Sequence, residues 1–362
     1  MSAGNVLAIR AGSRALARLR SHGADPADIA MVPAAAGGPK GLTLIGLDRA
    51  IFGEWLPRAP RERWLVGASI GAWRMAAACL PDPLGSLDRL VLQYCDEQNY
   101  RAKPTPAEVS VICDDIVGHL INGDAHALLS NSQYKLVVLT VRGRGPIASD
   151  YPGSAMGWAL AATANTFGRR HLAKFLHRGV FASDAAAVPF FRHRFDAFAN
   201  DVVPLSPENL RTALLASGSI PLILAGVNDI AGAPRGTYWD GGIIDYHLAL
   251  PYASLDGLVL YPHFAEDVTP GWLDKVFRNR RATAAALDNV VMIGPTREFI
   301  ADLPGRKLPD RSDFKRYGKD HAARSRDWRR AVAESERLGE AFLRWCDKPD
   351  LAMIKGFEAS LN

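Results

Sequence analysis

Residues 64–71 constrain the fold of this chain more than any other segment. The apolar run Trp64–Val66 leads into a serine, Ser69, which has glycines two positions before and two positions after it, Gly67 and Gly71. In a G-x-S-x-G elbow the serine sits on a sharp turn between a strand and a helix, and its hydroxyl projects outward. Helix-forming residues follow as far as Pro81, which stops the helix. The segment therefore predicts a strand, a tight turn that carries a candidate nucleophile, and a helix.

A second glycine cluster lies upstream of this elbow. The sequence GGPKG, at Gly37–Gly41, follows the apolar segment Ile29–Pro33 and precedes a helical run over 42–52. The backbone N–H groups of a glycine-rich turn at a helix N-terminus bind phosphate or stabilise an oxyanion. A phosphate loop of the Walker type needs a Ser or Thr directly after its lysine. Lys40 is instead followed by Gly41, so nucleotide binding is a poor fit and an oxyanion hole is the better interpretation.

The third motif is the sequence YWDGG at Tyr238–Gly242. An acid at the end of a short aromatic strand, with two glycines behind it, can approach a neighbouring side chain closely. An isolated Asp-Gly is a common turn, however, and carries little information by itself. Asp240 therefore becomes a candidate functional residue only in combination with the two motifs before it.

Taken together, the three motifs resemble those of the patatin-like phospholipase family of acyl hydrolases. That family has, in this order, a G-G-G-x-[K/R]-G oxyanion loop, a G-x-S-x-G elbow and an Asp-Gly-[Gly/Ala] motif, and its catalysis uses a Ser–Asp dyad with no histidine. The resemblance covers about residues 28–262 and includes the small-residue helix 213–221, which ends in Ile-Pro. One position departs from the pattern, because Ala36 stands where the first glycine of the loop is expected. Its methyl group is tolerable if Ala36 keeps a negative φ.

The resemblance implies a role for each matched residue. Ser69 would be the nucleophile and Asp240 the base that activates it, and water would then release the acyl group. The N–H groups of Gly37 and Gly38, together with that of Ile70, would form the oxyanion hole. The other matched positions support the motifs and are Lys40, Gly41, Gly67, Gly71, Gly241 and Gly242. The implied function is hydrolysis of lipid carboxyl esters (phospholipids, lysophospholipids or glycerides) through a covalent acyl-enzyme, without a cofactor.

Two alternatives remain open at this point. An α/β-hydrolase would use a Ser–Asp–His triad with a late histidine, for which His247, His263 and His321 are the candidates. The oxyanion glycines lie only one strand–helix unit before the elbow, which suits the patatin arrangement better. A non-catalytic lipid- or anion-binding protein could share the fold, but the intact motifs argue against it.

The rest of the chain alternates strands and helices, as a mostly parallel sheet with helices on both faces does. The predicted strands are Ile29–Pro33, Trp64–Val66, Lys135–Val141, Arg178–Ala182, Tyr238–Asp240, Leu258–Tyr261 and Val290–Ile293. Residues 84–132 predict a helical insertion over the carboxyl edge of the sheet, and 143–157 predict a loop. The expected fold class is α/β, and the resemblance makes it a patatin-like three-layer sandwich. Residues 1–300 would form the hydrolase domain, and 301–362 a basic, helical C-terminal extension packed on it, with a closing helix over 331–345.

The composition is that of an ordinary globular enzyme. The 362 residues are 48% hydrophobic and 22% charged, and there is no apolar run of the length that a membrane span requires. The segment Met1–Arg20 mixes arginines with aliphatic residues and predicts an amphipathic helix rather than a signal peptide. The four cysteines lack C-x-x-C spacing, as expected for reduced thiols in a cytoplasmic protein. His119 and His126 have no closer third ligand, so we expect no metal site.

The net charge of +5 comes from a single segment. Residues 297–330 hold eleven lysine or arginine residues against six acidic ones, and Phe314, Tyr317 and Trp328 are interleaved with them. Such a stretch can contact an anionic membrane surface peripherally or receive an acidic substrate. A solvated helical face with its own acidic partners is the simpler interpretation. Nucleic acid is not an expected partner, since no recognition motif accompanies the charge. The oligomeric state is left open by the sequence.

Overall fold

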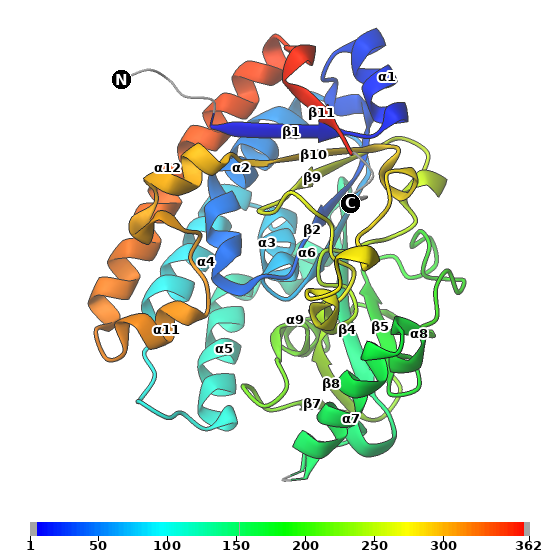
Figure 1. The fold of residues 1–362 in the computed structure, drawn as a ribbon, viewed down its shortest axis with the longest axis vertical. Helices are drawn as coiled ribbons and strands as arrows, with labels where there is room; N and C mark the ends of the chain where they lie inside the picture. The colour runs from blue at the N-terminus through cyan, green and yellow to red at the C-terminus, as the bar shows by residue number, and fades with distance from the viewer. Residues whose placement is uncertain (1–5, 152, 358–362) are drawn as a thin grey trace.

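The structure is a computed structural model that describes residues 6–151 and 153–357. Within these residues, an eleven-stranded sheet runs through the molecule and helices lie on both sides of it, so the chain is an α/β protein (Figure 1). The strands are β1 Leu7–Ala11, β2 Ile29–Ala34, β3 Arg63–Ala68, β4 Tyr134–Gly143, β5 Leu176–Ala182, β6 Asn200–Pro204, β7 Val227–Asn228, β8 Thr237–Asp240, β9 Leu258–Pro262, β10 Val290–Pro295 and β11 Ile354–Gly356. This arrangement confirms the predicted α/β class and is compatible with three layers.

The strand order is β11-β1-β10-β9-β2-β3-β4-β5-β6, with β8 paired to β4 and β7 paired to β8. The five strands from β10 to β4 in this order are parallel to their neighbours. Antiparallel pairs flank them, β1 on β10 and β5 on β4. Strands β2 and β3 are buried along their whole length, as parallel strands covered by helices on both faces are.

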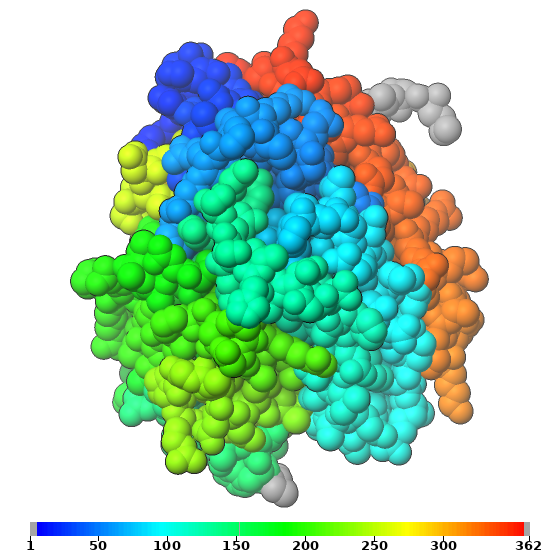
Figure 2. All heavy atoms as spheres, turned by 180° about the vertical axis from the view of Figure 1, so that it is seen from behind, coloured from blue at the N-terminus to red at the C-terminus, as the bar shows by residue number. Residues whose placement is uncertain are grey.

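The helices that cover the sheet are α1 Ser13–His22, α2 Ile45–Ala50, α3 Ile70–Cys79, α4 Pro83–Asp96, α5 Pro106–Ile121, α6 Ala125–Leu129, α7 Ser154–Thr166, α8 Arg169–Leu172, α9 Leu210–Gly218, α10 Arg297–Asp302, α11 Ser312–Tyr317 and α12 His321–Asp347. Helix α12, orange to red at the left of Figure 1, packs on α2 and α4. Helices α4 to α6, light blue to teal, cover much of the face seen in Figure 2. No helix in the described residues has an apolar stretch long enough to cross a bilayer.

All seven predicted strands are present, with bounds that differ from the predicted ones by at most two residues. The helical insertion over 84–132 is also present, as α4, α5 and α6. The predicted loop over 143–157 ends at Gly153, where α7 begins, and the predicted closing helix is the last part of the longer α12. Strands β1, β6, β7 and β11 were not predicted; β7 has only 2 residues, and β6 and β11 lie at the two ends of the sheet.

The prediction of one amphipathic helix over Met1–Arg20 is confirmed only from Ser13 on, where α1 begins, and is wrong for Leu7–Ala11. Residues 1–5 lie outside the described residues, and Leu7–Ala11 form β1, which pairs antiparallel with β10. Buried and half-buried side chains alternate along this strand, which is the period of a strand and not of a helix. At Gly12 an added Cβ would lie 2.2 Å from the carbonyl oxygen of Leu287, so the chain turns there tightly against the neighbouring segment before α1 begins.

Candidate active site

Two strands end opposite each other beside β4. Strand β3 runs parallel to β4, with Ala68 opposite Leu139, and β8 runs antiparallel to β4, with Asp240 opposite Thr140. Because β5 occupies the other edge of β4, β8 continues on the edge where β3 stops. Ser69 is the first residue after β3 and Asp240 is the last residue of β8. The register of the sheet therefore brings together two residues that are far apart in the sequence.

Ser69 and Asp240 form a buried hydrogen-bonded pair. The Ser69 hydroxyl donates a hydrogen bond to Oδ2 of Asp240 at 2.9 Å, and Oδ1 of Asp240 accepts a hydrogen bond from the backbone N–H of Gly242 at 2.7 Å. Burial raises the pKa of Asp240, while the Arg311 guanidinium and these two hydrogen bonds act in the opposite direction. A carboxylate with a raised pKa is a stronger base, and this one lies within reach of the hydroxyl proton. The pair can therefore activate the serine.

The elbow at Ser69 has the geometry that the motif requires. Ser69 has φ 56° and ψ −133°, a conformation that residues other than glycine rarely adopt and that clusters at functional sites. A Cβ at Gly71 would lie 2.0 Å from the carbonyl oxygen of Ala34, and one at Gly67 would lie 2.4 Å from the backbone nitrogen of Ala72. Gly71 thus allows the elbow to pack directly on the end of β2, and Gly67 allows the first turn of α3 to pack on β3.

The candidate oxyanion loop follows β2. Gly38 has φ 57° and begins a tight 3-10 segment, over Gly38–Leu44, that leads into α2, so the predicted helix over 42–52 begins in a tighter form. Among the described residues, we find no hydrogen-bond acceptor for the N–H groups of Gly37, Gly38 and Ile70. Ala36 has no positive φ, so its methyl group causes no strain there. The three N–H groups remain available to an oxyanion.

The remaining matched glycines lie where backbone segments of the site meet. A Cβ at Gly241 would lie 2.2 Å from the carbonyl oxygen of Leu139 in β4, and one at Gly242 would lie 2.7 Å from Cβ of Ala36. A Cβ at Gly41 would come within 3.1 Å of the Ile70 side chain. These glycines therefore let the loop, the elbow and the aspartate turn contact one another.

Sequence reasoning missed a serine that supports the elbow from below. The hydroxyl of Ser217, near the end of α9, accepts a hydrogen bond from the backbone N–H of Ser69 at 2.8 Å. The same hydroxyl donates a hydrogen bond to the carbonyl oxygen of Leu139 at 2.7 Å. The next serine, Ser219, accepts the backbone N–H of Asp240 through its carbonyl oxygen at 2.8 Å. The end of α9 thus holds both members of the pair. Its small residues were noted in the sequence, but they gave no signal for a particular hydroxyl.

A buried ion pair joins the candidate oxyanion loop to the elbow. Asp48 on α2 accepts two hydrogen bonds from Arg74 on α3, at 2.6 and 2.7 Å, and both side chains are buried. Helix α2 follows the loop and α3 follows Ser69, so this pair fixes one motif against the other. Sequence reasoning missed it, because neither residue stands in a motif.

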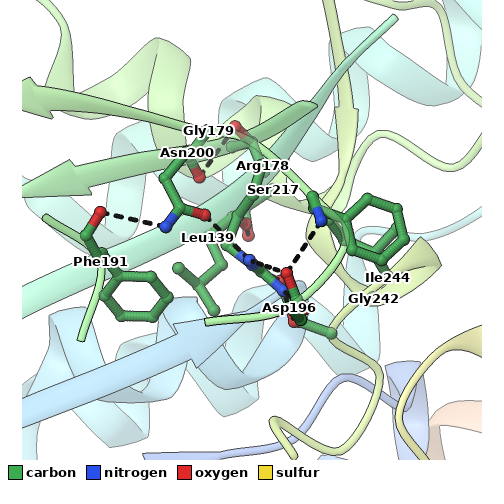
Figure 3. Close-up of polar contacts among 12 residues, drawn as sticks. Leu139, Arg178, Gly179, Phe191, Asp196, Asn200, Ser217, Gly242 and Ile244 are labelled. Carbon is green, nitrogen blue, oxygen red and sulfur yellow. Dashed lines mark hydrogen bonds and ion pairs between the residues drawn. The ribbon is translucent and has the colours of Figure 1, made fainter. Parts of the chain in front are cut away.

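A second buried ion pair fixes the turn after Asp240. Arg178 on β5 donates to Asp245 at 2.7 and 3.0 Å. The same guanidinium donates to Asp196 and to Asn200, as the close-up shows (Figure 3). Asp245 lies five residues after Asp240, and its backbone N–H donates a hydrogen bond to the carbonyl oxygen of Gly241. Burial of both charges makes the pair costly to break from one side.

The three candidate histidines have other partners. His247 and His263 are buried, and their Nδ1 atoms contact the carbonyl oxygens of Asp267 and Ala265. Burial lowers the pKa of both, that of His263 to about 4. His321 lines a cavity that also contains Ser69, but its Nδ1 contacts Arg324. In the described part of the chain, the side chain bonded to the Ser69 hydroxyl is Asp240.

Two cavities flank the pair. One has a volume of about 520 Å³ and is lined by Gly38 and Ser69, and the other has about 590 Å³ and is lined by Gly37 and Asp240. Both are also lined by Arg311, and most of the remaining lining residues are apolar. Their volumes are in the range of small-molecule sites. The pair therefore lies between two cavities that could receive the two parts of an ester.

Three cations lie near these cavities. Lys275 Nζ is 4.1 Å from the ring centroid of Tyr246, and partial burial, with Lys40 and Arg311 nearby, lowers the pKa of Lys275 to about 8. Burial also lowers the pKa of Lys40, whose Nζ lies 5.3 Å from the ring centroid of Phe264.

Arg311 shows that the basic segment 297–330 is not only a solvated face. Its Nε would lie 3.4 Å from a Cβ placed at Gly38, so this guanidinium stands beside the oxyanion loop. Other members do match the simpler interpretation, since Arg329 pairs with Asp96. Charge counting in the sequence cannot separate these two situations.

Within the described residues, no group of three His, Cys, Asp or Glu side chains is placed to hold a metal ion.

Comparisons with known proteins add little to this geometry. No family model matches the chain, and no curated protein matches it. A solved structure, VipD from Legionella pneumophila, shares 12% sequence identity with the chain at a TM-score of 0.31. The likeness covers 66% of this chain and 50% of VipD, so the chain spans about half the length of that protein. A likeness this distant carries no argument about function.

Proposed function

We propose that the chain is a serine acyl hydrolase of the patatin type, which cleaves lipid carboxyl esters through a Ser–Asp dyad. The observation that carries the proposal is the 2.9 Å hydrogen bond from the Ser69 hydroxyl to Asp240, at an elbow with positive φ. The free N–H groups of the adjacent loop and the largely apolar cavities support it. A patatin-like three-layer sandwich is the corresponding proposal for the fold.

In the proposed mechanism, Asp240 serves both halves of the reaction. Ser69 Oγ attacks the ester carbonyl carbon while Asp240 takes the hydroxyl proton, and the N–H groups of Gly37, Gly38 and Ile70 stabilise the oxyanion. The bond to the leaving alcohol breaks and the alcohol receives the proton from Asp240. A water molecule then loses a proton to Asp240 and attacks the acyl carbon. Collapse releases the carboxylic acid and returns the proton to Ser69.

The cavities support lipid esters as the substrate class. The larger cavity is lined by Trp158, Ile243 and Trp272 together with several alanine and leucine residues, which suit an acyl chain. The smaller cavity is also lined by two exposed lysines, Lys315 and Lys319, which suit a polar or acidic leaving group. No feature of either cavity selects among phospholipids, lysophospholipids and glycerides.

The proposal is tested with a panel of lipid esters and a water-soluble chromogenic ester. We expect the wild-type protein to hydrolyse the chromogenic ester and at least one lipid ester, and Ser69→Ala to lose both activities while keeping its thermal midpoint. Ser183→Ala is a matched control, because Ser183 is a serine outside the site. Hydrolysis by the Ser69→Ala protein at the wild-type rate would refute the proposal, and so would a wild-type protein that hydrolyses no ester.

We also propose that residues 301–362 are an extension of the hydrolase domain 1–300. Contacts of α12 with α2 support this, including a hydrogen bond from the Gly46 N–H to Ser335 Oγ at 2.9 Å. Pairing of β11 with β1 supports it as well. Limited proteolysis should then release no stable fragment that ends near residue 300, and release of such a fragment would contradict the proposal.

A further inference from the structure

Helix α7 has an unusual outer face. Its thirteen residues, Ser154–Thr166, include no Asp, Glu, Lys or Arg, although one side of the helix is exposed. Met156 is 70% exposed and Leu160 is 50% exposed on this side. A surface helix of a globular protein normally carries charged or polar residues on its outer face. An exposed face of this kind is more typical of a helix that contacts another apolar surface.

Two further segments place exposed apolar side chains beside α7. Leu222 and Ile223 lie in the loop after α9, and Trp272 and Val276 lie in a later turn that packs on α7. We call these six residues the apolar rim: Met156, Leu160, Leu222, Ile223, Trp272 and Val276. They are six of the eleven large apolar side chains that are exposed in the described part of the chain. Such a concentration from three segments marks an interaction surface.

The apolar rim continues into the larger cavity of the candidate site. Leu222, Ile223 and Trp272 line that cavity, as do Ala155 and Ala159 of α7. The same cavity reaches Asp240. An acyl chain could therefore pass from the rim to the proposed dyad along apolar side chains.

The charges beside the apolar rim are mostly basic. Arg278 is exposed in the segment that holds Trp272 and Val276, Lys275 of the same segment is partly covered by Tyr246, and exposed Arg170 follows α7. The acidic residue of the same segment, Asp274, is buried and paired with arginines. An apolar surface with cations at its edge is complementary to a bilayer with anionic headgroups. A tryptophan at such an edge fits the boundary between headgroups and acyl chains.

We propose that the apolar rim docks on an anionic lipid surface and delivers acyl chains into the cavity that reaches Asp240. This inference rests on the proposed function, and it places the lipid contact at α7 and its neighbours rather than at the basic segment 297–330. The docked face holds the mouth of the cavity against the lipid, so the substrate need not cross water.

The test measures co-flotation of the full-length protein with vesicles of phosphatidylcholine and phosphatidylglycerol. The Ser69→Ala background keeps the lipids intact during the assay. The test variant combines Met156→Gln, Leu160→Gln and Val276→Gln, which change no charge and are not among the residues that line the cavity. The control combines Leu92→Gln and Val111→Gln, which replace exposed apolar residues on α4 and α5 (50% and 62% exposed). We expect more than tenfold weaker binding for the test variant and less than twofold for the control.

A second variant tests the charges. Lys275→Gln with Arg278→Gln should weaken binding to the mixed vesicles and leave the weaker binding to pure phosphatidylcholine unchanged. Unchanged vesicle binding by the triple variant would overturn the proposal, and so would an equal loss in the control. Concentration-dependent self-association that the triple variant abolishes, without vesicle binding by either protein, would assign the rim to a second copy instead.

A separate readout distinguishes failure of the docking proposal from failure of the proposed function. In the active background, the triple variant should hydrolyse the water-soluble ester within twofold of wild type and lose most of its activity on vesicles. Vesicle binding that depends on the apolar rim, in a protein that hydrolyses no ester, would refute the hydrolase and support the docking surface. Equal activity of both proteins on vesicles would overturn the docking proposal alone.

Discussion

Replacing Ser217 by alanine tests whether the end of α9 holds the elbow in place. The change removes two short hydrogen bonds, one from the N–H of Ser69 and one to the carbonyl oxygen of Leu139. The Ser69 N–H then stays buried without an acceptor, which costs roughly 1–3 kcal/mol, and the lost bond to Leu139 adds about 1 kcal/mol. We therefore expect the free energy of unfolding in urea to fall by about 2–4 kcal/mol. We also expect kcat on a chromogenic ester to fall more than KM rises, because Ser69 loses its fixed position.

Ser219→Ala is the matched control for this prediction. Ser219 is also buried at the end of α9, but its hydroxyl donates to the carbonyl oxygen of Leu215 in the same helix, at 3.0 Å. Loss of that bond leaves no backbone N–H of the site without a partner, so the cost should be about 1 kcal/mol or less. The reasoning is wrong if the two alanine variants have the same urea midpoint and the same kcat.

Three groups of variants test the proposed base, the guanidinium that lowers its pKa and the candidate histidines. Asp240→Asn should lower turnover by about 10²–10⁴, as loss of a general base does, and hydrolysis at the wild-type rate would contradict this. Burial raises the pKa of Asp240 in the folded protein, so ionisation of Asp240 destabilises the folded state. The same variant should therefore unfold at a higher temperature than wild type at neutral pH, where Asp240 is ionised. In strong acid, where Asp240 is protonated, the two unfolding temperatures should be equal. Activity requires ionised Asp240, so kcat/KM should fall as the pH drops through this raised pKa. Arg311→Met should move that limb of the pH profile to higher pH, because the guanidinium lowers the pKa of Asp240, and an unmoved limb would exclude this attraction. Alanine at His247, His263 or His321, assayed where each variant is folded, should keep activity within about tenfold, or 1.4 kcal/mol, and a larger loss at one of them would favour a triad.

The sequence predicted the strands well where local patterns determine them. Continuous apolar runs bounded by turn residues marked β2, β3, β9 and β10, and the structure contains all of them. The error at β1 arose because Leu7, Ile9 and Ala11 are too few to distinguish the period of a strand from that of a helix. Pairing with β10 decides the conformation of that segment, and β10 lies far along the chain from it.

The candidate site could likewise be predicted from the sequence only in part. The contact of Ser69 with Asp240 could be expected from the motifs, and the register of β3 and β8 on β4 gives its physical cause. Their catalytic roles stay predictions. Ser217 and the Asp48–Arg74 pair could not be predicted, since each acts through a contact between distant segments and stands in no motif. Arg311 was hidden for a different reason, because a basic segment looks the same whether its members face water or a cavity.

In the proposed mechanism Ser69 is a nucleophile that Asp240 activates. The most direct measurement is peptide mass spectrometry of the wild-type protein and of Asp240→Asn after reaction with a fluorophosphonate probe. We expect one stoichiometric adduct on the Ser69 hydroxyl in the wild-type protein and strongly reduced labelling in Asp240→Asn. An adduct on another residue, or ester hydrolysis by a wild-type protein whose Ser69 stays unlabelled, would refute this mechanism.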